Sequence, residues 1–141
     1  MSKAYGLAGL RVGSAIAHPD LITSIDKVAA PFAIPGVSQA AAVAALLPAA
    51  QAELSQRVGL IRSERTRVVT ELRALGFDVP PSQANLVWLP VGAKALDTFA
   101  VLERAGVVSR MFDGDGVRIT IGAPAENDMV IEALRGIAST R

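Results

Sequence analysis

The chain contains no cysteine, a single histidine and few aromatic residues, which make up 4% of its 141 positions. The absence of cysteine excludes disulfides and thiolate metal sites. The lone histidine, His18, disfavours a metal centre and is expected to serve a helix start instead. No uninterrupted apolar stretch reaches the roughly 18 residues that a membrane-spanning helix needs, and no basic and apolar leader pattern opens the chain.

Neither sign of charge dominates, because 14 lysines and arginines stand against 13 aspartates and glutamates. Nothing in this balance favours nucleic acid or an anionic membrane as a partner. Hydrophobic residues make up 51% of the chain and charged residues 19%, a composition typical of folded proteins. We therefore expect a soluble, cytoplasmic protein that binds neither nucleic acid nor a membrane.

The first half of the chain is rich in alanine, and the mean hydropathy of the whole is +0.40. Two interpretations stay open: apolar surface that requires a partner, or an alanine-rich helical core. Residues 10–17 are predicted to form a buried strand, and His18-Pro19-Asp20 to begin a helix. Residues 38–47 are predicted to form a second helix that is buried on most sides.

The longest periodic segment covers residues 48–75, and Gly76 follows where a left-handed helix cap is expected. Its apolar residues recur at steps of three and four, namely Leu54, Val58, Ile61, Val68, Leu72 and Leu75. At the standard helical rise this segment would measure roughly 40 Å, more than a small domain needs. We therefore predict a helix that connects two bodies.

Short strands and helices are predicted beyond Gly76. Strands are expected at 84–90, 107–112 and 117–121, and helices at 93–105 and from residue 123 onward. A tight turn at 113–116 joins the last two strands, which predicts an antiparallel pair and an α+β arrangement. Trp88 is expected to lie in the core of this part.

The most informative segment is the run from Ser2 to Gly13, which reads Ser-Lys-Ala-Tyr-Gly-Leu-Ala-Gly-Leu-Arg-Val-Gly. Lys3 is followed by three glycines, and Arg11 lies eight residues downstream of it. This arrangement suits an amine nucleophile beside a phosphate-bearing cofactor. Without its flanking residues, a lysine so near the start of a chain would be interpreted as a solvated side chain, and the glycine spacing is a weak signal.

This run closely resembles the lysine segment of fold-type I pyridoxal-phosphate aminotransferases, in the histidinol-phosphate and aromatic amino acid branch. Ser-Gln-Ala-Asn at 82–85 and Arg-Ile-Thr-Ile-Gly at 118–122 resemble two further motifs of the same family. The resemblance covers essentially the whole chain and corresponds to a C-terminal portion of the family. It implies an α/β fold in which 1–47 form the tail of the large cofactor-binding domain, 48–76 the connecting helix, and 77–141 a small α+β domain.

The resemblance also implies a cofactor site for pyridoxal 5′-phosphate. Lys3 would be the catalytic lysine that binds the cofactor aldehyde and moves a proton. Ser2 and Arg11 would bind the cofactor phosphate, because a guanidinium fork matches a phosphate in two-point geometry.

Three residues of the C-terminal half resemble the family's substrate-binding positions. Arg118 would pair with the acidic group of the substrate, and Arg110 is a second, weaker correspondence. A strand arginine that faces solvent is the alternative for Arg118. Asn85 is the third candidate, although its role can be limited to backbone bonding at the start of a strand.

The implied reaction is transfer of an amino group between an aromatic amino acid or histidinol phosphate and a 2-oxo acid, in a homodimer. In the family, an aspartate, a tyrosine, an asparagine and an aromatic residue upstream of this segment hold the cofactor ring, and none has a counterpart here. We therefore expect the chain alone to be inactive. The alternative is a non-catalytic truncated product, or a fragment that dimerises or complements a partner.

Overall fold

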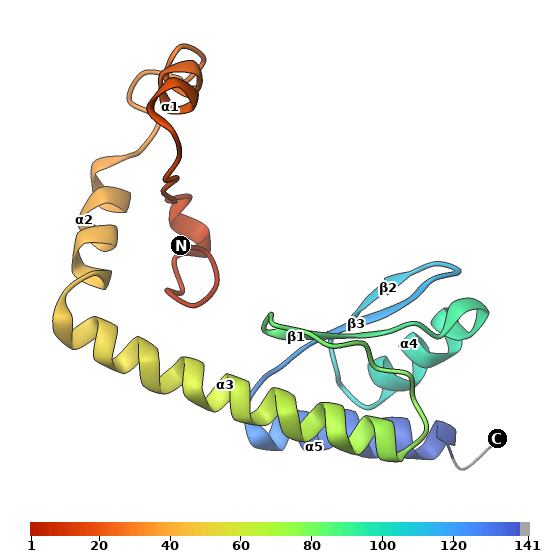
Figure 1. The fold of residues 1–141 in the computed structure, drawn as a ribbon. Coiled ribbons are helices and arrows are strands. Elements are labelled where there is room, and N and C mark those ends of the chain that lie inside the picture. The colour runs from red at the N-terminus through yellow and green to blue at the C-terminus, as the bar shows by residue number, and fades with distance from the viewer. Residues whose placement is uncertain (139–141) are drawn as a thin grey trace. The chain divides into compact units, whose positions relative to one another are not determined.

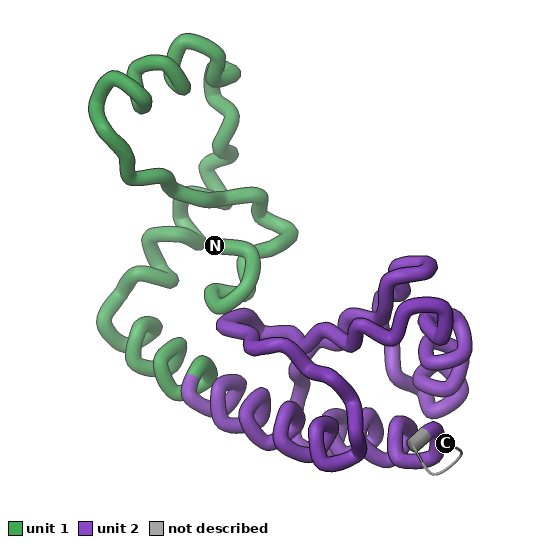
Figure 2. Tube along the Cα trace, turned by 45° about the vertical axis from the view of Figure 1, so that its right-hand side comes forward, with its two compact units in different colours: residues 1–58 green, residues 59–141 purple. Residues whose placement is uncertain are grey.

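The computed structural model describes residues 1–138 and contains both helices and a small sheet, which confirms the mixed α/β class. The chain divides into two compact units, residues 1–58 and the residues from Gly59 onward (Figure 2). The boundary between them falls inside one long helix. The division into 1–47, 48–76 and 77–141 stays a prediction, and residues 139–141 of its last part lie outside the described residues.

The first unit contains a short 3-10 turn, η1 (Ala8–Leu10), two helices, α1 (Pro19–Asp26) and α2 (Gly36–Ala45), and the start of α3 (Pro48–Ala74). The strand predicted at 10–17 is wrong, because residues 12–18 adopt no regular structure and Ile16 is fully exposed. A strand needs a neighbour to satisfy its backbone groups. The strands found in residues 1–138 all pair with one another in the second unit.

Local signals place the first two helices. The ring nitrogen Nδ1 of His18 accepts a hydrogen bond from the backbone N–H of Asp20 at 3.4 Å, and Pro19 occupies the first helical position, so the predicted helix start is confirmed. The predicted second helix is confirmed as α2, but its predicted burial is wrong. Only Ser38 is buried there, and Val37 and Val43 are 67% and 64% exposed.

The long helix is confirmed as α3, which has 27 residues and thus measures about 40 Å. Gly76 ends it in a left-handed conformation with φ of +87°. The N–H of Phe77 donates to the carbonyl of Leu72 at 3.0 Å, and that of Gly76 to Arg73 at 2.9 Å. These two bonds form a Schellman cap, which satisfies carbonyls that the helix end would leave free. No helix within residues 1–138 combines the length and the apolar character needed to cross a bilayer.

The second unit is built on a three-stranded sheet of β1 (Leu86–Leu89), β2 (Arg110–Phe112) and β3 (Gly116–Thr120). The strand order is β1-β3-β2 and both pairings are antiparallel, as the tight turn between β2 and β3 predicts. A 3-10 turn, η2 (Gly92–Lys94), and helix α4 (Ala95–Arg104) connect β1 to β2, and α5 (Pro124–Ala138) follows β3.

The hydrophobic core lies between one face of this sheet and the helices α3, α4 and α5, of which α3 and α5 run side by side (Figure 1). Its fully buried members come from all four elements and include Leu72, Leu89, Leu102, Ile119 and Leu134. Trp88 lies in the predicted strand, β1, but its predicted place in the core is wrong, because it is only half-buried. It alternates with the buried Val87 and Leu89, so it projects from the face of the sheet opposite the core.

Candidate functional site

The first candidate site is the N-terminal loop, which we define as residues 1–12. The amino group of Met1 donates to the carbonyl of Val12 at 3.0 Å, so the loop closes on itself. Inside it the N–H of Gly6 donates to the carbonyl of Lys3 at 2.9 Å, which forms a tight turn. Gly6 has φ of +69°, a conformation that side-chain-bearing residues rarely adopt. The loop therefore holds Lys3 at the beginning of a defined turn.

The three predicted cofactor-binding residues all lie in the N-terminal loop. The Lys3 side chain is exposed, and among residues 1–138 its ammonium makes no hydrogen bond or ion pair. Ser2 is half-buried, and the guanidinium of Arg11 donates to the carbonyl of Ala8 at 2.9 Å. That single bond leaves most of the guanidinium's five donors available. A hydroxyl, an amine and a guanidinium on one closed loop fit a ligand that carries a phosphate and an aldehyde.

Arg11 itself has a left-handed backbone conformation, with φ of 50° and ψ of 41°. Such a conformation is uncommon for a residue with a side chain and is concentrated at functional positions and turns. Added Cβ atoms at Gly9 and Gly13 would meet no atom within 4 Å. The backbone on both sides of Arg11 therefore faces open space.

The second candidate site lies on the sheet of the second unit. Arg110 in β2 is directly opposite Arg118 in β3, which is in turn opposite Trp88 in β1. The neighbours of Arg118 along β3, Val117 and Ile119, are buried in the core. The two arginines and the tryptophan therefore share the other face, because side chains alternate along a strand. We call this surface, with Phe112 included, the arginine face.

Phe112 is the residue of the arginine face that sequence reasoning missed. The guanidinium carbon of Arg110 lies 5.2 Å from the centre of its ring, and that of Arg118 lies 6.0 Å away. The ring of Trp88 meets it edge-on, with centroids 5.5 Å apart and planes at 79°. The sequence Arg110-Met111-Phe112 could have predicted that Phe112 lies beside Arg110, because residues two apart in a strand share a face.

The arginine face carries two positive charges that form no ion pair within residues 1–138. No carboxylate among residues 1–138 lies within ion-pair distance of Arg110 or Arg118. Like charges directly opposite each other in a sheet destabilise the strand pairing. Two unneutralised guanidinium groups in this arrangement are suited to bind an anionic ligand.

Asn85 lies immediately before β1 and is half-buried. Its carbonyl accepts a hydrogen bond from the N–H of Ile121 at 3.0 Å, so it extends the pairing of β1 with β3 by its backbone. Ser82 forms the turn that leads into the strand, since its hydroxyl donates to the carbonyl of Leu86 at 2.7 Å. Backbone bonding is thus present at Asn85, and a substrate role for its amide stays a prediction.

A polar network, also missed from the sequence, fixes the joint between β3 and α5. The guanidinium of Arg67 in α3 lies 2.7 Å from a carboxylate oxygen of Glu64 and 2.8 Å from one of Asp128. The buried amide of Asn127 donates to Glu64 at 2.9 Å, and it bonds both the N–H and the carbonyl of Gly122 at 3.0 Å. The network therefore ties the backbone at Gly122, just beyond the end of β3, to α3 and α5.

Two pKa values respond to this network. Hydrogen bonds from Arg67 and then from Asn127 hold the pKa of Glu64 below its usual value, and the nearby positive charge adds to the effect. The same bond with Glu64, followed by the bond with Asp128, raises the pKa of Arg67. Both groups therefore stay charged in the folded protein at neutral pH.

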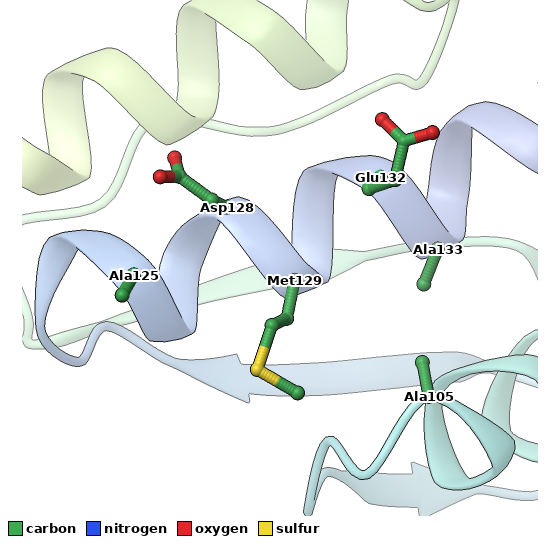
Figure 3. Close-up of a pocket in the computed structure, with 6 residues that line it drawn as sticks. All are labelled: Ala105, Ala125, Asp128, Met129, Glu132 and Ala133. Atoms are coloured by element: carbon green, nitrogen blue, oxygen red, sulfur yellow. The ribbon is translucent and has the colours of Figure 1, made fainter.

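An open hollow of about 470 Å³ lies between the end of α4 and one side of α5 (Figure 3). It is lined by Ala105, Ala125, Asp128, Met129, Glu132 and Ala133. Figure 3 shows the two carboxylates turned away from the side chain of Met129. None of the predicted site residues lines this hollow, and no cationic group in it could bind a phosphate or a carboxylate. Size alone therefore does not make it the candidate site.

The structure brings the predicted residues together in two groups. Ser2, Lys3 and Arg11 share the N-terminal loop of the first unit, and Arg110 and Arg118 share the arginine face of the second. A single site made from both groups stays a prediction. No group of three or more acidic or histidine side chains able to hold a metal ion is found among residues 1–138.

Comparison with known proteins gives consistent matches over nearly the whole chain. The sequence profile of the family described as aminotransferase class I and II matches residues 1–134. An aromatic amino acid aminotransferase from Mycobacterium avium (strain 104) is 56% identical over 131 residues, which are 93% of this chain and 36% of that protein. A protein of the same name from Mycobacterium tuberculosis (strain ATCC 25618 / H37Rv) is 52% identical and is covered to 37%.

Solved structures of similar fold include histidinol-phosphate aminotransferases. That from Sinorhizobium meliloti, in complex with pyridoxal-5′-phosphate, is 31% identical with a TM-score of 0.77, over 99% of this chain and 39% of that one. That from Clostridium acetobutylicum is 24% identical with a TM-score of 0.83, over 100% of this chain and 45% of that one, and shows the fold alone. The chain thus spans little more than a third of the length of the two mycobacterial relatives.

Proposed function

Because the chain belongs to the class I and II aminotransferase family, we propose that it forms the C-terminal portion of a pyridoxal-phosphate enzyme that transfers an amino group between an aromatic amino acid and a 2-oxo acid. The family resemblance of the three sequence motifs is thereby confirmed. The observation that carries the substrate class is the 56% identity to an aromatic amino acid aminotransferase. Histidinol phosphate is the alternative substrate, supported by the likeness to the Sinorhizobium meliloti enzyme at 31% identity.

In this proposal the N-terminal loop holds the cofactor. When bound, pyridoxal 5′-phosphate supplies an aldehyde that captures amines and a ring that withdraws electrons from the substrate carbon. The amine of Lys3 would hold the cofactor between turnovers and would take up and return a proton at the substrate carbon. The Ser2 hydroxyl and the remaining N–H donors of Arg11 would bind the phosphate.

The exposure of Lys3 limits what this chain can do alone. An amine acts as a base only when it is neutral, which burial or covalent attachment brings about. The side chain of Lys3 is exposed in the first unit. The part of the relatives that this chain does not span would cover the amine and hold the cofactor ring. We therefore propose that the 141-residue chain by itself transfers no amino groups.

The arginine face anchors the substrate in this proposal. Arg118 pairs with the anionic group of the amino acid and of the 2-oxo acid, because its planar fork matches two oxygens at once. Arg110, directly opposite, adds a second guanidinium to the same anion. The complete enzyme would act as a cytoplasmic homodimer.

The second candidate is a non-catalytic fragment that complements or dimerises with a partner. It is favoured by the apolar surface of the first unit, where Ile16 and Phe32 are fully exposed and Val28 is 84% exposed. Large apolar side chains that gather on a protein surface are typical of interaction sites. In both proposals another polypeptide covers this apolar surface. They differ in whether Lys3 then acts as a catalyst.

The test supplies the missing part in trans. The chain is mixed with the remaining part of the Mycobacterium avium relative and with pyridoxal 5′-phosphate. Amino transfer from phenylalanine to 2-oxoglutarate and the absorbance of lysine-bound cofactor are then measured. We expect both signals in the mixture and neither in the chain alone. Lys3→Ala is expected to abolish both, with a loss of at least about a thousandfold in rate, because it removes the nucleophile.

Lys27→Ala is the matched control, because Lys27 is another exposed lysine of the first unit. It is expected to leave rate and absorbance unchanged. A Lys3→Ala mixture that retained the absorbance of lysine-bound cofactor would refute the catalytic assignment. Stable association without any transfer by the parent chain would support the complementing fragment instead.

A further inference from the structure

We propose that Phe112 is a positioning residue that holds the guanidinium groups of Arg110 and Arg118 side by side as one binding site for a carboxylate or phosphate group. This inference rests on the substrate-binding role proposed above for the two arginines, and it adds the residue that keeps their guanidinium groups together. Phe112 does not touch the ligand in this scheme. It acts through the two arginines.

The first step is the position of the two cations. Arg110 and Arg118 are cross-strand partners on the same face of the sheet, so their backbones bring two positive charges close together. Left alone, such side chains would swing apart into solvent, because like charges directly opposite repel. No carboxylate among residues 1–138 holds either of them in place. Something uncharged must therefore keep them together.

The second step is the ring between them. The ring centre of Phe112 is 5.2 Å from the guanidinium carbon of Arg110 and 6.0 Å from that of Arg118. Both distances lie within the range of about 6 Å over which an aromatic ring attracts a cation. One ring thus contacts two cations that would otherwise separate.

The third step is what orients the ring. Phe112 is paired with Gly116, so no side chain stands opposite it on β3. Trp88 fills this space from the far strand, because a Cβ on Gly116 would lie 2.8 Å from its indole ring. The edge of Trp88 then meets Phe112 at 79°. Edge-to-face contact of this kind is a favoured aromatic geometry, and it fixes the Phe112 ring.

The fourth step is the consequence for the ligand. If a carboxylate side chain of the protein held these arginines instead, it would occupy their N–H donors and cancel their charge. A ring attracts the cation through its face and accepts no conventional hydrogen bond. The donors of Arg110 and Arg118 therefore stay available to one anionic group. The carboxylate of an amino or 2-oxo acid and the phosphate of a phosphorylated substrate both have this chemistry.

The test measures the arginine side chains directly in the full chain. The Nε–Hε signals of Arg110 and Arg118 are followed by nuclear magnetic resonance during titration with inorganic phosphate and, separately, with phenylpyruvate. Protons over a ring face resonate upfield, so we expect upfield arginine side-chain signals that move together with added ligand. Phe112→Leu should abolish the upfield shift and weaken binding about fivefold, whereas Phe112→Tyr should retain both.

Two further variants separate the possible failures. Phe99→Leu is the control, since Phe99 packs against the core from α4, and it should leave the arginine signals and the affinity unchanged. Arg118→Gln should abolish binding of both ligands. If it does not, or if the parent chain binds neither ligand, the anchor role itself fails and this inference with it.

The inference alone is overturned if Arg118→Gln abolishes binding while Phe112→Leu keeps the affinity and the arginine shifts of the parent. Backbone amide signals of β1 and β3 report whether Phe112→Leu still folds. If those signals are lost, the test depends on Phe112→Tyr, whose ring still offers a face to both cations. If Phe112→Tyr folds but its two arginine signals no longer move together with added ligand, the proposal is overturned. The relative affinities for phosphate and phenylpyruvate distinguish the two ligand sources.

Discussion

Gly116 organises the arginine face through the side chain that it lacks. A Cβ at this position would lie 2.1 Å from the backbone oxygen of Leu89 and 2.8 Å from the ring of Trp88. Backbone cannot give way as a flexible side chain can, so β1 and β3 approach this closely only because residue 116 is glycine. The aromatic pair on the same face depends on the same vacancy.

Gly116→Ala is therefore expected to destabilise the chain by about 3 kcal/mol, through overpacking between two paired strands. Urea unfolding followed by circular dichroism measures the change. Gly59→Ala is the matched control. It lies in α3 with no atom within 4 Å of an added Cβ, so the better helix former should raise stability by roughly 0.5–1 kcal/mol. Equal stability of Gly116→Ala and the parent would contradict the strand packing described.

At the scale of elements, the joint between α3 and α5 is held by ionised groups. Glu64 accepts hydrogen bonds from Arg67 at 2.7 Å and from Asn127 at 2.9 Å, and these bonds lower its pKa below the ordinary 4.5. A folded-state pKa below that of the unfolded chain means that folding favours the carboxylate. This contribution to stability is full above the unfolded value and is lost as the pH falls through the folded one.

We therefore expect Glu64→Gln to lower the urea midpoint at about pH 7, and to differ less from the parent at a pH low enough to protonate this carboxylate in the folded protein. Circular dichroism at the two pH values measures both midpoints. Glu132→Gln is the control, because Glu132 is 79% exposed in a surface pair with Arg135, and its effect should be small. A Glu64→Gln deficit that is equally large at both pH values would rule out the ionisation argument.

Local signals predicted the elements well where the chain carries its own caps. His18 with Pro19 begins α1, and Gly76 ends α3, because these residues act on the backbone within one turn. The strand predicted at 10–17 failed because a strand requires a neighbour that local sequence does not provide. Likewise, the apolar pattern of α2 predicted a helix correctly but not its exposure, since burial depends on what packs against it.

The same distinction holds for the candidate site. The antiparallel pairing of the two strands follows from the tight turn between them and was predicted, but their register was not. A turn over 113–116 would place Arg110 opposite Ile119, whereas in the structure Phe112 pairs with Gly116 and Arg110 with Arg118. The role of Phe112 could not be predicted either, because it depends on Trp88 from a third strand and on the vacancy at Gly116. Contacts between distant segments need the register of the whole sheet.

At the scale of the whole molecule, the two units differ in how they bury apolar side chains. The hydrophobic core belongs almost entirely to the second unit, whereas in the first Val12 is the only buried apolar residue. Many large apolar side chains of the first unit are exposed instead, among them Ile16, Val28 and Phe32. Of the two interpretations of the alanine-rich half, this exposure favours surface that requires a partner.

The isolated chain is accordingly expected to bind a hydrophobic fluorescent dye and to self-associate as its concentration rises. The double variant Ile16→Ser with Phe32→Ser should reduce both effects, as should the missing part of the relative added in trans. Val108→Ser is the control, because Val108 is 95% exposed but lies in the second unit, and it should change little. Dye fluorescence and light scattering give the measurements. A chain that neither binds dye nor associates would contradict a partner-seeking surface.

The uncharged ring between Arg110 and Arg118 has a consequence for acid sensitivity. Phenylalanine has no proton to gain or lose, and guanidinium groups stay charged in proteins. The two arginines and the ring of Phe112 therefore carry the same charge in mild acid as in mild base. Release of an anion on acidification would report protonation of that anion alone, so a carboxylate and a phosphate would leave at pH values set by their own ionisation.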